Sequence, residues 1–299
     1  METKLYEELT AKGVGDSTAK LYVRNLKTLN GGAFKNITFL KDIEAVEDKL
    51  KDYKDNTKKT YYASMCSVLK GKKPYTKAYK HYFDKMMELS KDVKEKESEN
   101  EKSDTQKENW ISWEDVEKIK NELKSKIDFK SRKLTKSQYD TLLAYVVLSL
   151  YTDIAPRRNM DYLLMEVSKA KNVDDSKNWY VPKERVFIFN KYKTAKKYGK
   201  QTLDTTPIED VLKMYLKYHP LSKSAQFPLL VDYDSKPLTS VNAITRILNR
   251  IFKKKVGSSM LRHIYITQKF GDVIEEQKKT AEEMGHSTEE QKSYYLKEK

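Results

Sequence analysis

The sequence of 299 residues has a single cysteine, Cys66, and only nine glycines. One cysteine cannot form a disulfide within the chain, and it excludes a cysteine-rich zinc site. Few glycines argue against the glycine-rich loops that cradle phosphates, and the sequence contains neither a Walker A pattern nor a dinucleotide fingerprint. We therefore expect no nucleotide-dependent chemistry, no cofactor and no metal site, and we expect a reducing compartment.

Long apolar runs are also missing. The longest run, residues 142–151, reads LLAYVVLSLY, which is about half the length that spans a bilayer. Residues 1–13 carry charges where a secretion signal would have an apolar region. We therefore expect an intracellular protein, in the cytoplasm or the nucleus, that is neither secreted nor held in a membrane.

Positive charge, by contrast, is abundant. The formal net charge is +15, and 34% of the residues are charged, so the surface must be heavily solvated. A basic protein of this size is usually attracted to a polyanion, of which nucleic acid is the commonest. Apolar residues make up 38% of the chain, which suffices for a core. These features favour a globular protein that binds nucleic acid.

The charged segment 94–109, KEKESENEKSDTQKEN, predicts a boundary between two domains. It mixes charges of both signs and has no aromatic residue, so it cannot bury enough apolar surface to offset the entropy of ordering. We favour a flexible linker, and a solvated helix is the alternative because Glu and Lys are good helix formers. The expected domains span residues 1–93 and 110–299.

The first domain reads as helical. Apolar residues recur at helical spacing in three segments, which predicts helices at 16–30, 55–71 and 75–91. Basic residues on the polar faces of these helices are candidate contacts to DNA phosphates, with a merely solvated surface as the equal alternative. These residues are Arg24, Lys27, Lys58 and Lys59.

The second domain is expected to be rich in helix with one small antiparallel sheet, which makes the whole chain mainly α. The predicted helices are 110–127, a buried central helix at 137–152, 208–219, 240–255 and 258–270. Between them, β-branched and aromatic residues predict a short strand and then a hairpin with arms near 186–192 and 201–205.

Four separated segments of the second domain carry the functional signal. They are YTDIAPRRNMDY (151–162), FNKYKTAKKYGK (189–200), SSMLRHIYIT (258–267) and MGHSTEEQKSYY (284–295). Arginines after a proline often face water, and lysines at a hairpin tip are usually solvated. Arg262 is harder to dismiss, because a charge within an otherwise apolar helix needs a partner.

In this order the segments resemble the boxes of the tyrosine recombinases, the phage-integrase-like family of DNA strand-transfer enzymes. RRNMDY is similar to the first arginine box of the family, KYKT to its hairpin lysine, SMLRH to its second box and MGHS to its third. The resemblance covers nearly the whole chain. In the sequence of these motifs, the chain is most similar to integrases of large DNA viruses, virophages and related mobile elements.

The resemblance implies a helical core-binding domain at 1–93 and a catalytic domain at 110–299. It implies a site-specific recombinase or integrase that cuts and rejoins double-stranded DNA through a 3′-phosphotyrosyl intermediate, without ATP or metal, as a homotetramer. The catalytic residues that it implies are Arg158, Lys193, Arg262, His286 and Tyr295.

Several assignments within the resemblance stay open. Asp161 lies three residues after Arg158, as the family's acidic residue does, which favours Arg158 over Arg157. Tyr294 is the alternative nucleophile, because two adjacent residues on a helix cannot both face one phosphate. Lys196 and Lys197 are candidate nonspecific contacts to DNA phosphates.

The physical chemistry of the reaction supports these roles. Two guanidiniums can neutralise the non-bridging oxygens of the transition state, and a lysine can protonate the leaving 5′ oxygen. The tyrosine then holds the 3′ end of the DNA covalently. Ser287 and Glu290 have the spacing of a capping box, which predicts a short helix that starts after His286 and presents one tyrosine.

One departure from the family pattern is Ser259, which stands where a histidine is usual. Serine can hydrogen-bond a phosphate oxygen but is no general base near neutral pH. Two alternative functions therefore remain: a type IB topoisomerase, which shares the catalytic residues, and a non-catalytic DNA-binding relative.

Overall fold

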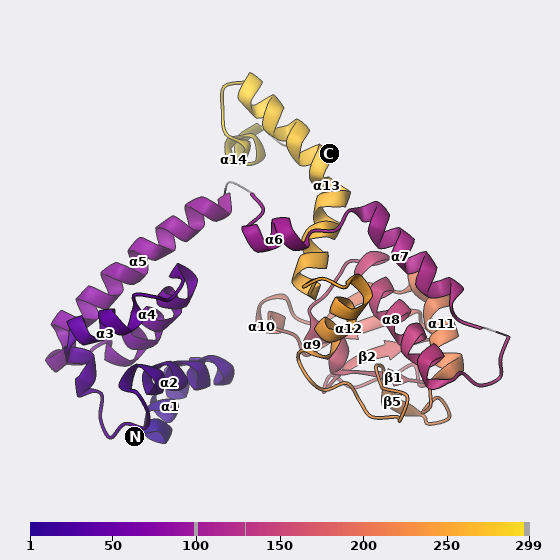
Figure 1. Ribbon diagram of the computed structural model, residues 1–299, viewed down its shortest axis with the longest axis horizontal. Coiled ribbons are helices and arrows are strands. Elements are labelled where there is room, and N and C mark those ends of the chain that lie inside the picture. The colour runs from indigo at the N-terminus through magenta and orange to yellow at the C-terminus, as the bar shows by residue number, and fades with distance from the viewer. Residues whose placement is uncertain (99–100, 129, 296–299) are drawn as a thin grey trace. The chain divides into compact units, whose positions relative to one another are not determined.

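The computed structural model describes residues 1–98, 101–128 and 130–295, with backbone only for residues 92–98 and 294–295. Two units make up the chain, Met1–Lys102 and Ser103–Lys299 (Figure 1). The division falls within the segment 94–109 that the sequence marks as a boundary.

The first unit is helical. Its helices are α1 (Glu2–Ala11), α2 (Asp16–Asn30), η1 (Thr38–Lys41), α3 (Ile43–Leu50), α4 (Asp55–Leu69), η2 (Lys73–Tyr75) and α5 (Thr76–Ser98). The helix predicted at 16–30 has these bounds, since Gly31 takes a left-handed conformation (φ +77°) that ends α2. A buried hydrogen bond of 2.9 Å from Asn25 Nδ2 to Ser64 Oγ joins α2 to α4.

The charged segment 94–109 is largely helical. Residues 94–98 belong to α5, and Asp104–Asn109 form α6, which begins with a capping box between Ser103 and Gln106. Over its described residues, a helical segment therefore fits better than a structureless linker. Its abundant Glu and Lys favour helix, and the cap satisfies the first backbone N–H groups of α6. Residues 99–100 lie outside the described part.

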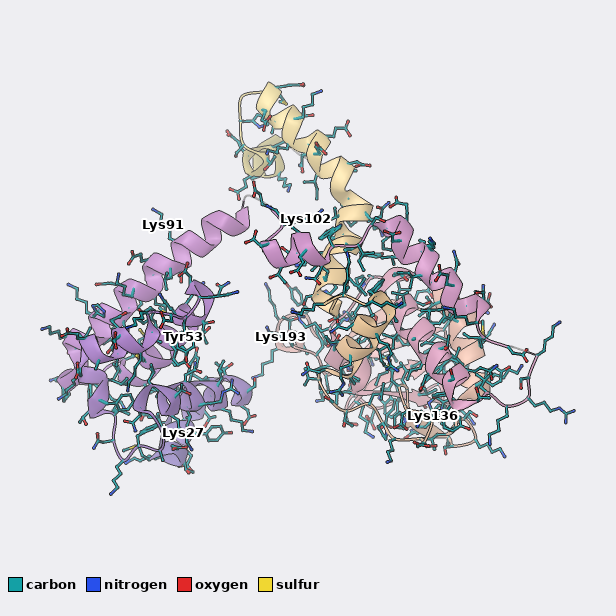
Figure 2. The ribbon with its side chains drawn as sticks, viewed as in Figure 1. Lys27, Tyr53, Lys91, Lys102, Lys136 and Lys193 are labelled. Carbon is teal, nitrogen blue, oxygen red and sulfur yellow. The ribbon has the colours of Figure 1, made fainter. Side chains whose placement is uncertain are left out.

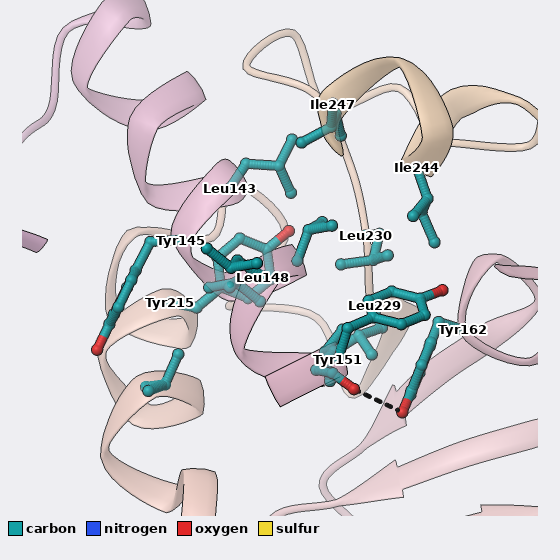
Figure 3. Close-up of a cluster of buried hydrophobic side chains, with 14 of the residues drawn as sticks. Leu143, Tyr145, Leu148, Tyr151, Tyr162, Tyr215, Leu229, Leu230, Ile244 and Ile247 are labelled. Atoms are coloured by element: carbon teal, nitrogen blue, oxygen red, sulfur yellow. Dashed lines mark hydrogen bonds between the residues drawn. The ribbon is translucent and has the colours of Figure 1, made fainter. Parts of the chain in front are cut away.

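Helices also dominate the second unit. They are α7 (Trp113–Ser125), α8 (Lys136–Thr152), α9 (Asn159–Leu163), α10 (Ala195–Tyr198), η3 (Thr206–Ile208), α11 (Glu209–Tyr218), α12 (Ala243–Phe252), α13 (Ser258–Glu283), α14 (Thr288–Glu290) and the π-helical turn η4 (Gln291–Tyr295). As predicted, α8 is central and buried, and it packs on α7, α11, α12 and α13. Figure 3 shows its Leu143, Leu148 and Tyr151 among side chains of the surrounding elements.

A five-stranded sheet lies in the second unit. Its strands are β1 (Met165–Ser168), β2 (Asn178–Val181), β3 (Val186–Phe189), β4 (Gln201–Asp204) and β5 (Gln226–Pro228), in the order β4-β3-β2-β1-β5. The predicted hairpin corresponds to β3 and β4. The prediction of an antiparallel sheet is wrong for one pair, since β1 and β2 run parallel. β1 and β2 have only four residues each. The connection 169–177 can therefore run back along the sheet to the end at which β1 starts without forming a helix.

The last long helix extends farther than predicted. α13 continues beyond residue 270 to Glu283, and Figure 1 shows its outer part leading away from the other helices of the second unit, with α14 at the far end. Within the described ranges, no helix is both long and apolar enough to cross a membrane.

Candidate functional site

Segments that are far apart in the sequence line one pocket with a volume of about 920 Å³. They come from the start of α9, the connection between β3 and α10, and the first turns of α13. The pocket is lined by several residues that the sequence analysis singled out: Arg158, Lys193, Lys196, Ser259 and Arg262. Three of the four sequence segments therefore meet at one place.

Arg158 and Arg262 are half-buried in the wall of this pocket. Arg158 is the N-cap residue of α9, and Arg262 lies on α13 between the buried Leu261 and Ile264. Among the residues that the structure describes, neither guanidinium has an ion-pair or hydrogen-bond partner. Two half-buried cations without a protein partner favour an anion as the missing partner.

Arg157 has a different role from Arg158. Its Nε atom pairs with Asp161 Oδ2 at 3.1 Å, and its Nη1 atom donates to Gln201 Oε1 at 2.6 Å. Its Cζ atom also lies 4.0 Å from the ring centroid of Phe189 and 4.8 Å from that of Tyr192. Arg157 thus ties the start of α9 to both arms of the hairpin, and it is a structural residue.

The carboxylate of Asp161 therefore forms no ion pair with the guanidinium of Arg158, the arginine that its spacing suggested. The carboxylate pairs with Arg157, and its side chain is 3% exposed. Burial raises the pKa of Asp161 from its ordinary value, although the charge of Arg157 beside it acts in the opposite direction. With Asp161 and Arg157 paired, the charge facing the pocket comes from Arg158, Arg262 and the lysines.

Lys193 and its neighbours form the tip of the hairpin (Lys193 is labelled in Figure 2). The side chains of Lys191, Lys193 and Lys196 are exposed and line the pocket. Lys197 does not line it, and its Nζ atom lies 5.0 Å from the ring centroid of Tyr198. This tip adds the positive charge of solvent-exposed lysines to a pocket that the two half-buried arginines also line.

Asn178 positions this tip, although the sequence analysis did not single it out. Its side chain is fully buried, and its Oδ1 atom accepts from the N–H groups of Asn190 at 2.9 Å and Lys191 at 2.7 Å. Its Nδ2 atom donates to the carbonyls of Asp161 at 3.0 Å and Lys191 at 2.9 Å. One amide thereby fixes the lysine segment relative to α9. The only sequence signal is an asparagine that opens an otherwise apolar strand.

Asn159 holds the other side of the pocket. Its Nδ2 atom donates to the carbonyl of Val241 and to Thr245 Oγ1, both at 3.2 Å, and its Oδ1 atom accepts from the hydroxyl of Tyr151 at 2.8 Å. Burial raises the pKa of Tyr151 well above its ordinary value, so this hydroxyl stays protonated and donates. The network joins α8, α9 and α12 behind Arg158.

His286 does not line the pocket. α13 runs unbroken from Ser258 to Glu283, so Arg262 and Glu283 lie about 32 Å apart along the helix axis at 1.5 Å per residue. His286 follows the left-handed Gly285 (φ +75°), and the cap predicted at Ser287 is present, with Ser287 Oγ accepting from the N–H of Glu290 at 3.1 Å. The structure thus separates the fourth sequence segment from the other three.

The two candidate tyrosines follow in the same distal segment. Tyr294 and Tyr295 have their backbone in the turn η4, and their side chains lie outside the described part of the structure. Ser259 is exposed on the first turn of α13 at the rim of the pocket.

The candidate DNA contacts of the first unit lie on α2 and α4. Arg24 and Lys27 are exposed, and Lys58 and Lys59 are half-buried. Lys27 forms a long ion pair with Glu2 (3.5 Å), which leaves it accessible (Lys27 is labelled in Figure 2). These residues are compatible with contacts to a phosphate backbone and equally with a solvated surface.

Among the described residues, no group of three or more His, Cys, Asp and Glu side chains could hold a metal ion. The pocket is instead lined by cations, so an anion is the ligand that its chemistry favours. Comparison of the chain with protein-family models, curated proteins and solved structures gave no match.

Proposed function

We propose that the chain is a DNA strand transferase of the tyrosine recombinase type, acting on double-stranded DNA as an integrase of a viral or mobile element. One observation carries this proposal: Arg158 and Arg262, from distant segments, share a pocket with Lys193 and have no protein partner among the described residues. The order of the four sequence segments supports the same reading.

The two arginines suit a phosphodiester. Guanidiniums are planar, stay charged at any physiological pH and form paired hydrogen bonds with phosphate oxygens. When a phosphate is attacked, charge grows on its non-bridging oxygens, and fixed cations stabilise that charge more than they stabilise the ground state. Arg158 and Arg262 would hold these oxygens.

The proposed reaction exchanges one phosphodiester for another. The hydroxyl oxygen of Tyr295, or of Tyr294 if the register differs by one residue, attacks the phosphorus and forms the 3′-phosphotyrosyl bond. The bond from phosphorus to the 5′ oxygen breaks, and Lys193 protonates that oxygen. The phenol proton passes to water, because Ser259 is no base near neutral pH. A 5′ hydroxyl reverses these steps and reseals the strand without ATP.

The distal segment must come to the arginines for this reaction. His286 and the backbone of both tyrosines lie beyond the end of α13, whereas Arg262 lies near its start. A complete site therefore requires either a bend in α13 or a segment from another copy of the chain. We propose that the active form is a tetramer on DNA.

Covalent trapping tests the proposal. In EDTA, the protein is mixed with nicked, end-labelled duplexes that carry either the termini of its own element or random sequence, and it is then denatured in detergent. We expect a labelled protein–DNA adduct that Tyr295→Phe abolishes and Tyr294→Phe retains; the reverse pattern would move the nucleophile by one residue. If the wild-type protein binds these duplexes but yields no adduct on any of them, it is not a strand transferase.

A non-catalytic DNA-binding protein is the second candidate. It is favoured by Ser259 in place of the family's histidine and by the separation of His286 from the pocket. Under this alternative, changing both tyrosines to phenylalanine leaves every measurable activity unchanged. Relaxation of any supercoiled plasmid, without a specific site, would instead identify a topoisomerase.

A further inference from the structure

We propose that residues 124–128 and 130–136, at the junction of α7 and α8, bind the phosphate backbone of duplex DNA at a surface separate from the pocket. Together these residues are the basic loop. The inference does not depend on whether the chain cuts DNA, and it concerns a part of the second unit to which the four sequence segments do not belong.

The basic loop concentrates the positive charge of the chain. It contains six basic residues and one acidic residue, a net charge of +5, whereas the whole chain of 299 residues carries +15. All six basic side chains are exposed to solvent. They are Lys124, Lys126, Lys130, Arg132, Lys133 and Lys136. Like charges this close in sequence repel one another, so a polyanion that neutralises them is a favourable ligand.

Little of this charge is neutralised within the chain. Lys136 forms a long ion pair of 3.8 Å with Asp234, and both of these side chains are mostly exposed. Among the residues that the structure describes, the other five basic side chains of the loop form no ion pair. The one acidic residue of the loop, Asp128, accepts from the backbone N–H of Lys130 at 3.0 Å. Its carboxylate therefore holds the loop backbone and pairs with no lysine.

The backbone of the basic loop is held in place by the body of the second unit. Ile127 and Leu134 are buried in the core, with 5% and 3% exposure. Between them, the hydroxyl of Tyr218 donates to the carbonyl of Ser131 at 3.0 Å, and Ser131 Oγ donates to the carbonyl of Lys133 at 2.7 Å. A loop whose backbone is already fixed loses less conformational entropy when it binds a ligand.

The basic loop and the pocket lie at opposite ends of α8. This helix begins at Lys136 and ends at Thr152, which is about 24 Å along its axis at 1.5 Å per residue, and Arg158 of the pocket follows its far end. Figure 2 shows Lys136 and Lys193 on different sides of the second unit. The loop is therefore a separate surface and not an extension of the pocket.

The side chains of the loop favour duplex DNA over other polyanionic or acidic partners. Ile127 and Leu134 are the only apolar residues among the described part of the loop, and both are buried. A protein interface needs an apolar core, a single-stranded nucleic acid needs aromatic side chains for stacking, and stable attachment to a membrane needs an apolar or lipid anchor besides basic residues. Contacts to the phosphates of a duplex need only cations.

Lysine acetylation of the full chain tests the proposal at single residues. The reagent is limiting, a duplex of random sequence is present or absent at physiological salt, and mass spectrometry gives the rate at each lysine. We expect the duplex to slow acetylation of Lys126, Lys130 and Lys133 at least about threefold, because bound phosphates cover these amines. Lys171 and Lys213 are exposed lysines that pair with Glu184 at 3.1 Å and Glu209 at 2.8 Å, and as controls they should react at unchanged rates.

The same experiment separates the basic loop from the pocket, because Lys193 reports on the pocket. If the duplex slows acetylation of Lys193 and of no lysine in the loop, the loop does not bind DNA, and the proposed function is untouched. Slower acetylation in the loop but not at Lys193 would support the loop and contradict DNA binding at the pocket. Vesicles of phosphatidylserine that protect the loop where the duplex does not would make a membrane surface its partner and overturn the proposal.

Fluorescence anisotropy at several salt concentrations then measures the contribution of the loop to binding. The double change Lys130→Gln and Lys133→Gln is made in the Arg158→Gln background, in which binding at the pocket is weakened. It should reduce the slope of log affinity against log salt by about 1.8, since each lost phosphate contact contributes about 0.9. Lys171→Gln with Lys213→Gln removes the same charge elsewhere and should keep the slope.

An equal slope in the loop variant and in its background would contradict the proposal. Circular dichroism verifies that the loop variant keeps its helix content. A reduced slope then reflects the two lost cations and not a change of fold.

Discussion

The guanidinium of Arg157 lies against the ring of Phe189, with its Cζ atom 4.0 Å from the ring centroid, while the adjacent Arg158 faces the pocket. The same guanidinium pairs with Asp161 and bonds to Gln201. The two neighbouring arginines therefore have different roles. Arg157 binds the hairpin to α9, and Arg158 remains available to an anion.

This division predicts that two alanine variants differ in how much stability they lose. Arg157→Ala leaves the carboxylate of Asp161 buried without its partner, which should lower the free energy of unfolding by about 3 kcal/mol. Arg158→Ala breaks no ion pair and no side-chain hydrogen bond, and it should change the free energy of unfolding by about 0.5 kcal/mol or less. Urea denaturation of both variants measures these values. Equal stability of the two variants would show that the Arg157 contacts contribute nothing.

A second prediction concerns Asn178. Asn178→Ala leaves the part-buried N–H groups of Asn190 and Lys191 without their acceptor, and the free energy of unfolding should fall by roughly 3 kcal/mol. Amide hydrogen exchange at Asn190 and Lys191 should become faster. Asn56→Ala, at an exposed position on α4, is the control and should change neither quantity. Unchanged exchange in Asn178→Ala would mean that another group holds the loop.

A third prediction is a pH dependence of stability that arises from His219. This ring is 2% exposed, and burial lowers its pKa from 6.5 to about 4. Its Nδ1 atom accepts from the N–H of Leu221 at 3.1 Å, so the neutral ring must donate from Nε2 to the carbonyl of Pro228.

The sign follows from which state binds the proton. Above pH 6.5 the ring is neutral in both states, and the full stability is present. Between 6.5 and about 4 the unfolded chain takes up a proton that the folded chain excludes, so stability falls with pH by up to about 1.4 kcal/mol per pH unit. Urea unfolding at several pH values should show this slope in the wild type. His219→Gln should lack it; an identical slope in both proteins would refute the assignment.

A fourth prediction concerns DNA binding. Arg158→Gln and Lys193→Gln should each weaken binding to duplex DNA and reduce the slope of log affinity against log salt by about 0.9, the value of one lost phosphate contact. Lys12→Gln removes a lysine that pairs with Glu8 at 2.7 Å, and it is the control expected to keep the slope. Fluorescence anisotropy at several salt concentrations gives the slopes of the wild type and of the three variants. A slope unchanged in both pocket variants would mean that DNA does not reach the pocket.

Local patterns in the sequence predicted much of the fold. α2 has the predicted bounds because Gly31 ends it, and β3 and β4 are the predicted hairpin because β-branched and aromatic residues flank a turn. The order of the motifs also placed Arg158, Lys193 and Arg262 in one region, and the structure puts all three at one pocket.

Features that depend on distant partners were missed. The parallel pairing of β1 and β2 is set by tertiary contacts and leaves no periodic signal in either strand. Asn178 acts through four contacts with loops that only the fold brings near. α13 passes through Gly271, where a helix end was expected, because one glycine costs only about 1 kcal/mol and good helix formers follow it.

The most direct test of the account is the rate of adduct formation by Arg262 variants on nicked duplex DNA in a single turnover. Arg262→Ala should slow the reaction at least about 100-fold, because a fixed cation is lost from the transition state. Arg262→Lys should restore it only in part, because an ammonium cannot bond two phosphate oxygens as a guanidinium does. An adduct formed by Arg262→Ala at the wild-type rate would contradict the central claim that this pocket holds the reacting phosphate.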